Sequence, residues 1–97
     1  MVVKVLPSEV ENLQDDDIII VNRAQVNAQL AFMSMDTNNK HAKENIQILK
    51  CAINNMLEQE KNQRSMAVGA KMTVSQVKQT FSKIEKMPQN SFVRVRA

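Results

Sequence analysis

The chain has 97 residues, a formal net charge of +3, one cysteine, one glycine and two prolines, and only 3% of it is aromatic. This length fits one domain with a modest core, the lone cysteine excludes an intrachain disulfide, and the longest aliphatic run, residues 18–21, is too short to cross a bilayer. Because an all-β fold needs many turn-forming residues, we expect a mainly α protein whose single domain spans residues 1–97.

The first predicted helix covers residues 18–35 and follows an acidic run, Asp15 to Asp17, which the helix dipole favours at an N-terminus. Short polar side chains then interrupt the pattern at residues 36–39. A second, longer helix is predicted over residues 40–68, closed by Gly69. Since the break is short, the two helices are expected to form an antiparallel hairpin.

A third helix is predicted over residues 74–87, ending before Pro88. Its start has the spelling of a capping box, in which Thr73 accepts from a backbone amide while Gln76 reaches back to Thr73. Residues 1–17 and 88–97 are left as terminal arms.

Each arm contains valines that alternate with basic residues, a pattern typical of short strands with one wet face. Val3 and Val5 flank Lys4, and residues 93–96 continue the same alternation. The two arms can therefore pair into a two-stranded ribbon, which needs helices beneath it to be stable.

The first two predicted helices have apolar residues on two sides rather than one. One stripe of the first helix contains Ile20, Ala24, Ala28, Ala31 and Met35, with Val21 and Phe32 beside it. We assign the oligomer interface to the opposite stripe and to the seam of the second helix, that is Ile19, Val26, Leu30, Met33, Ile46, Leu49, Ile53 and Met56. This interpretation predicts a homo-oligomeric helical bundle or coiled coil. The alternative is that the third helix and the arms cover the second stripe.

The sequence contains no complete set of catalytic or metal-binding residues. His41, Glu44 and Cys51 fall short of the four ligands of a structural zinc site, and no second histidine supports a nucleophilic cysteine. Gly69 stands alone, so there is no glycine-rich phosphate loop. We therefore expect a protein that is not an enzyme and that uses no cofactor or metal.

The basic and acidic residues are separated along the chain. Residues 1–60 carry five basic and nine acidic side chains, whereas residues 61–97 carry eight basic side chains and one acidic group, Glu85. This asymmetry indicates an anionic partner for the basic end, or head-to-tail contact between copies. The candidates for contact with phosphate are Lys71, Lys78, Lys86, Arg94 and Arg96.

Two functions follow as hypotheses. The first is a non-enzymatic assembly or adaptor protein that oligomerises through its first two helices and contacts a protein partner with its basic C-terminal third. The alternative is a small nucleic-acid-binding regulator or packaging protein that grips phosphate with the same third. In both cases we expect no membrane contact, because the longest aliphatic run is short. We expect a location in the cytoplasm or inside a particle assembled there, because the chain has only one cysteine.

Overall fold

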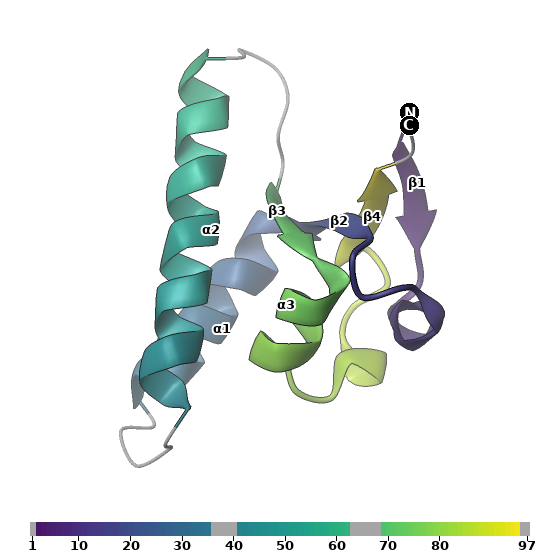
Figure 1. The fold of residues 1–97 in the computed structure, drawn as a ribbon, viewed down its shortest axis with the longest axis horizontal. Coiled ribbons are helices and arrows are strands. Elements are labelled where there is room, and N and C mark those ends of the chain that lie inside the picture. Colours follow the sequence, from purple (N-terminus) through teal and green to yellow (C-terminus); the bar gives the residue numbers. More distant parts are fainter. Residues whose placement is uncertain (1, 36–40, 63–68, 96–97) are drawn as a thin grey trace.

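The computed structural model describes residues 2–35, 41–62 and 69–95 (Figure 1). In chain order the elements are β1 (Val2–Val5), the 3-10 helix η1 (Pro7–Asn12), β2 (Ile18–Asn22), α1 (Arg23–Met35), α2 (Ala42–Asn62), β3 (Gly69–Thr73), α3 (Val74–Thr80), the 3-10 helix η2 (Ile84–Lys86) and β4 (Phe92–Val95). The strands of the described residues form one four-stranded antiparallel sheet with the order β1-β4-β2-β3. The expected all-α hairpin, bundle or coiled coil is therefore wrong, because this is a mixed α/β fold.

The first predicted helix, 18–35, is a strand followed by a shorter helix. Residues 18–21 are β-branched throughout, and such side chains favour the extended backbone and pack well on a pleated surface. Their burial alternates, with Ile19 and Val21 in the core and Ile18 exposed, which is the two-residue period of a strand. The helical stripe assigned to Ile19 therefore does not exist, and α1 begins only at Arg23.

The second predicted helix is present as α2, and its described end is Asn62. Residues 63–68 of the predicted span lie outside the described residues. Gly69 does not close a helix but begins β3, which pairs with β2 along its whole length. α1 and α2 contact each other (Figure 1). The contact between two consecutive helices is the one feature of the predicted hairpin that is present.

The third predicted helix begins where expected but is shorter. Its capping box at Thr73 is confirmed, and α3 ends at Thr80 rather than near residue 87. The chain then turns at Lys83, which has a positive φ of 53°, and makes the short helix η2. The predicted pairing of the two arms is also confirmed, because β1 and β4 are antiparallel neighbours. They form half of a larger sheet rather than an isolated ribbon.

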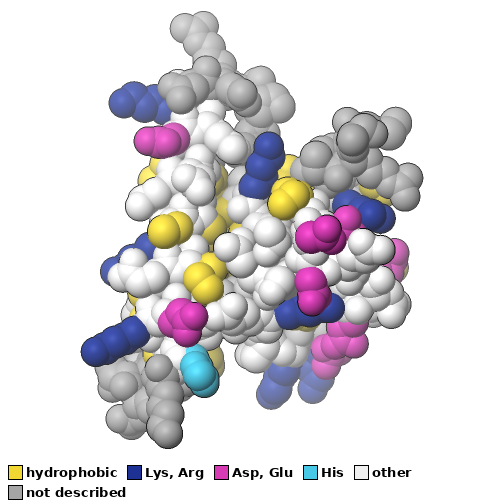
Figure 2. Space-filling view, viewed as in Figure 1, with side chains coloured by type: hydrophobic (Ala, Val, Ile, Leu, Met, Phe, Trp, Pro, Cys, Tyr) yellow, Lys and Arg dark blue, Asp and Glu magenta, His cyan; other side chains and the backbone are white. Residues whose placement is uncertain are grey.

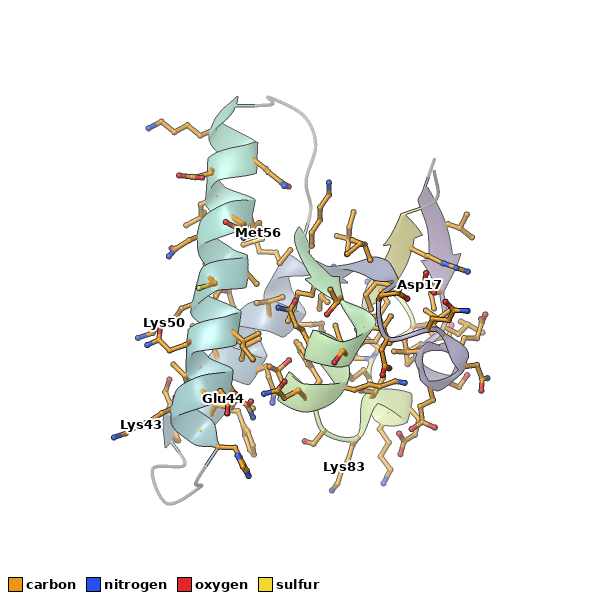
Figure 3. All side chains as sticks on the ribbon, in the orientation of Figure 1. Asp17, Lys43, Glu44, Lys50, Met56 and Lys83 are labelled. Carbon is orange, nitrogen blue, oxygen red and sulfur yellow. The ribbon has the colours of Figure 1, made fainter. Side chains whose placement is uncertain are left out.

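The core lies between one face of the sheet and the helices. Ile19, Val21 and Phe92 are fully buried on the strands, and Leu49 and Met56 of α2 belong to the same core cluster. Figure 2 shows hydrophobic side chains along the seam between α2 and the rest of the molecule. In Figure 3 Met56 points from α2 towards the sheet, whereas Lys43 and Lys50 point away from it. Among the described residues, the side chains on the opposite sheet face are exposed or half-buried, and one side of α1 is exposed.

Candidate interaction surfaces

Of the eight residues predicted to form an oligomer interface, seven lie in or against the core of a single copy. Ile19, Val26, Leu49 and Met56 are fully buried. Leu30, Met33 and Ile53 are partly buried and pack against the same core, and Ile46 is half-buried. In this fold the chain's own sheet and helices cover most of these side chains, which leaves little of their surface free to contact a second copy.

The second apolar stripe of α1 remains exposed. We call this surface the outer flank of α1 and define it by Ala24, Ala28, Ala31, Phe32 and Met35, all of which are exposed. Phe32 is 59% exposed and Met35 is 78% exposed. Residues 24–35 contain no charged side chain, whereas α2 carries charges along its length. Charge depletion combined with exposed aromatic and methionine side chains is typical of the centre of a protein interface.

Two shallow grooves border Phe32. One has a volume of about 270 Å³ and is lined by Ala28, Phe32, Phe81 and Met87, with Gln25, Gln29 and Ser82 at its edges. The other has a volume of about 280 Å³ and separates α1 from α2 and the end of α3. The walls of the first groove combine apolar side chains with uncharged polar ones. Those of the second are also mostly uncharged and include one basic residue, Lys78.

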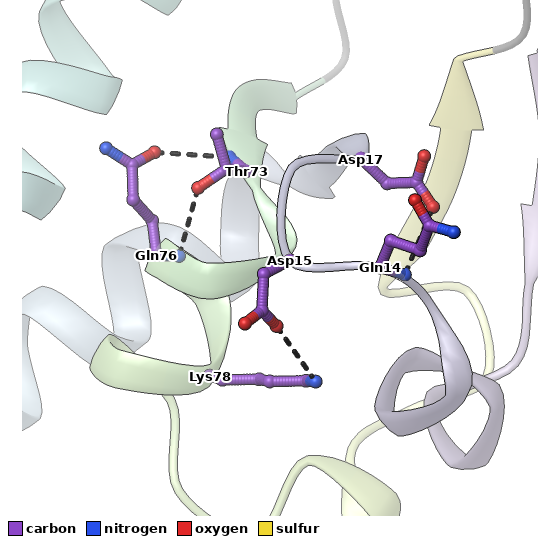
Figure 4. Close-up of polar contacts among 6 residues, drawn as sticks. All are labelled: Gln14, Asp15, Asp17, Thr73, Gln76 and Lys78. Carbon is purple, nitrogen blue, oxygen red and sulfur yellow. Dashed lines mark hydrogen bonds and ion pairs between the residues drawn. The ribbon is translucent and has the colours of Figure 1, made fainter.

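The acidic run at residues 15–17 lies in the turn before β2 and contacts the start of α3. The backbone oxygen of Asp17 accepts from Val74 N at 2.9 Å, and that of Asp15 accepts from Ser75 N at 3.0 Å. Thr73 Oγ1 accepts from Gln76 N at 3.1 Å, and Gln76 Oε1 accepts from Thr73 N at 3.1 Å (Figure 4). The first three amides of α3, which have no partner inside the helix, are thus all satisfied. The acidic run therefore caps the start of α3 through its backbone oxygens. It does not form the N-terminus of a helix at residue 18, as the sequence indicated.

Two of the five predicted phosphate-binding residues contact this acidic turn. Lys78 Nζ lies 3.3 Å from Asp15 Oδ1, and Arg94 Nη2 lies 3.2 Å from Asp17 Oδ2. Both pairs join the acidic half of the sequence to the basic half within one chain. Lys86 is exposed on η2 and Lys71 is exposed on β3. Arg96 lies outside the described residues. The structure does not bring the four described residues together on one face.

The second face of the sheet lies on the side away from the core and carries basic residues at both rims. Cross-strand pairing joins Lys4 to Val93, Val93 to Ile20, and Ile20 to Lys71, so these four side chains form one row across the four strands. Ile18 lies on the same face and is 40% exposed. Lys4 and Lys71 are exposed, while Ile20 and Val93 are half-buried. We call this surface, defined by these five residues, the open sheet face.

The described residues hold no group of three or more His, Cys, Asp and Glu side chains that could bind a metal ion. Cys51 is exposed on α2. Among the helices described, none is long and apolar enough to span a bilayer. Comparison with family models, with curated proteins and with solved structures found no match to this chain.

Each of the two surfaces has a signal in the sequence. The outer flank is the apolar stripe that runs through Ala24, Ala28 and Met35, but the interface was assigned to the opposite stripe. The open sheet face required Ile18 and Ile20 to be recognised as alternate positions of a strand. The β-branched character of this run was the signal that could have shown it.

Proposed function

We propose that this protein is a non-enzymatic assembly or adaptor protein that forms a two-fold dimer through the outer flank of α1. The observation that carries the proposal is the exposure of Phe32 and Met35 on a helix surface without any charged side chain from Ala24 to Met35. Leaving this apolar area in water costs free energy of roughly 25 cal/mol per Å², which contact with a second copy recovers.

The sizes of the side chains on this flank suit an antiparallel pairing of two copies. Ala24 and Phe32 each lie four residues from Ala28, about one helical turn to either side. A two-fold axis near Ala28 therefore sets Phe32 of one copy over Ala24 of the other, twice in each dimer. Alanine at the crossing point allows the helix axes to approach to about 8 Å. The surface is thus complementary to itself, as a two-fold interface must be.

The grooves beside Phe32 add room for this contact. The groove formed with Phe81 and Met87 has a volume of about 270 Å³, and its apolar walls can receive side chains from the second copy. Interfaces in which an aromatic side chain fills a pocket concentrate their binding energy there. Phe32 is accordingly the residue whose truncation should weaken the dimer most.

The proposed function needs no catalytic group. The compartment that we propose for the protein is inferred from its cysteine content. A single exposed thiol at Cys51 suits a reducing compartment, and we place the protein in the cytoplasm or in a particle assembled there. The alternative function, nucleic-acid binding by the basic C-terminal third, has weaker support. Two of its four described candidates, Lys78 and Arg94, already contact carboxylates of the same chain.

Sedimentation velocity at micromolar concentrations tests the proposal. The native chain should have a mass of about 22 kDa, twice the 11.0 kDa of one copy. Ala28→Glu puts two carboxylates at the centre of the proposed interface and should give monomers, while its helix content stays unchanged because glutamate is a good helix former.

The matched control is Gln47→Glu, which adds the same charge to an exposed position of α2 and should remain dimeric. A native chain that sediments at 11.0 kDa across the micromolar range refutes the proposal. So does an Ala28→Glu variant with the mass of the native protein.

A further inference from the structure

We propose that the open sheet face binds an amphipathic α-helix of a partner protein, one whose apolar stripe is bordered on both sides by Asp and Glu. This inference names the class of partner for the proposed adaptor. It depends on a different surface from the dimer contact, so either contact can exist without the other.

The first step is the chemical pattern of the face. Its central row has apolar side chains on the two inner strands, Ile20 on β2 and Val93 on β4, and lysines on the two outer strands. Ile18 extends the apolar strip along β2. Asn22 and Thr73 share this face by register, and none of its described residues is acidic. A ligand that matches this pattern is apolar along its middle and anionic at both sides.

The second step is the width of the face. Lys4 and Lys71 are separated by three strand spacings, since β4 and β2 lie between their strands. At about 4.8 Å per spacing, the two backbone positions are about 14 Å apart. An α-helix with its side chains is about 10–12 Å across. A helix laid along the strands therefore fits between the lysines, and carboxylates on its two flanks come within reach of both ammonium groups.

The third step is the comparison with other ligands. A single nucleic-acid strand is bound on sheets largely by stacking of its bases on aromatic side chains, and this row offers only Ile20 and Val93. An extended peptide pairs with the free edge of a strand rather than with a sheet face. Helices already pack on the other face of this sheet, where α2 contacts β3 and α1 contacts β2 and β3. A partner helix would give the sheet the same covering on its second side.

The test uses two designed peptides with acetylated and amidated ends and a fluorescent label. Both carry leucine at the i, i+3, i+4 and i+7 positions, and the residues that flank this stripe are glutamate in one peptide and lysine in the other. Binding is measured by fluorescence anisotropy at an ionic strength of about 0.15 M, where the Debye length is about 8 Å. The Ala28→Glu chain is used alongside the native chain, so that failure of the dimer and failure of this site are seen separately.

The glutamate peptide should bind saturably to both chains. The double variant K4E/K71E should bind it at least tenfold more weakly and should instead prefer the lysine peptide. The matched control is K43E/K50E, which makes the same change in net charge on the side of α2 that points away from the sheet (Figure 3). That variant should retain the affinity of the native chain for the glutamate peptide to within about twofold, since charges beyond a Debye length are screened.

Three results would overturn the inference. One is the absence of saturable binding of the glutamate peptide to the native chain and to the Ala28→Glu chain. Another is equal weakening by K4E/K71E and K43E/K50E, which would reflect net charge rather than this face. The third is tighter binding of single-stranded DNA or of anionic phosphatidylglycerol vesicles that is lost in K4E/K71E, which would assign the face to a different partner.

Discussion

Replacing Gly69 by alanine should destabilise the protein, because the first residue of β3 lies too close to β2 for a side chain. Gly69 pairs with Asn22. A β-carbon at this position would contact the carbonyl oxygen of Val21 and would lie 2.8 Å from both the Val21 carbonyl carbon and Ile20 Cγ2. Carbon atoms in favourable contact are about 3.5–4.0 Å apart. The obstacle is largely backbone of β2, a strand paired on both sides, so it cannot be relieved by rotating a side chain.

The expected magnitude follows from two opposing terms. Forcing extra atoms into a packed site costs about 1–3 kcal/mol, and the involvement of a central strand places Gly69→Ala in the upper half of that range. Where an alanine fits, the same substitution stabilises by about 0.4–1 kcal/mol, because it restricts the unfolded chain. The net loss in the free energy of unfolding is then about 1–2.5 kcal/mol. For a domain of this size it lowers Tm by roughly 4–20 °C.

Thermal and urea unfolding followed by far-ultraviolet circular dichroism measures this loss. The control is Lys71→Ala, an exposed substitution two residues further along β3, which should change the free energy of unfolding by less than about 0.5 kcal/mol. The sign of the effect is the decisive result. A Gly69→Ala variant as stable as the native chain, or more stable, would show that β3 does not approach β2 as described.

Two further substitutions test the ends of the short helical elements by the same unfolding assay. Thr73→Ala removes the oxygen that accepts from Gln76 N and should cost about 1 kcal/mol, whereas Thr73→Ser keeps the bond and should stay within about 0.5 kcal/mol of the native chain. Equal losses in the two variants would contradict a capping role. Lys83→Gly should stabilise by about 1 kcal/mol, because Lys83 has a left-handed backbone that glycine adopts without penalty. Lys83→Ala keeps the penalty and should be neutral, so a gain in both variants would point to charge instead.

The parts of the fold that the sequence predicted depend on local signals. The spacing of apolar residues fixed α2, and the spelling at Thr73 and Gln76 fixed the start of α3, because both are contained within a few turns of chain. The alternating valines at the two ends likewise predicted β1 and β4. Their pairing was also expected, since each needs a partner for its backbone groups.

The errors arose where a short element borders a longer one. Residues 18–21 were placed on the helical wheel of α1, although an unbroken β-branched run favours a strand. β3 has only two apolar residues, Ala70 and Met72, in alternation with Lys71 and Thr73, and that pattern is too brief to stand out after a long helix. The order β1-β4-β2-β3 depends on contacts between residues far apart in the sequence, which no local pattern contains.

The outer flank of α1 shows a related limit. A helical wheel shows that a helix has two apolar sides, but it does not show which side faces the core until the rest of the fold is known. Here Val26 faces the core, and Ala28 and Phe32 on the other side do not. The side of α1 that stays exposed therefore carries the proposed dimer contact, whereas seven of the eight residues that the sequence predicted for the interface belong to the core or pack against it.

The separation of charge along the sequence has a different meaning once the chain is folded. Some of the opposite charges pair within the chain, because Asp15 contacts Lys78 and Asp17 contacts Arg94. The pattern on the open sheet face instead combines a lysine from each half of the sequence, Lys4 and Lys71, which the strand order brings onto one surface. An anionic partner is thus better matched to a face that combines lysines from both halves of the sequence than to the C-terminal third alone. Reversing the charges of these two lysines in K4E/K71E tests that assignment more directly than removing charge from the whole C-terminal third.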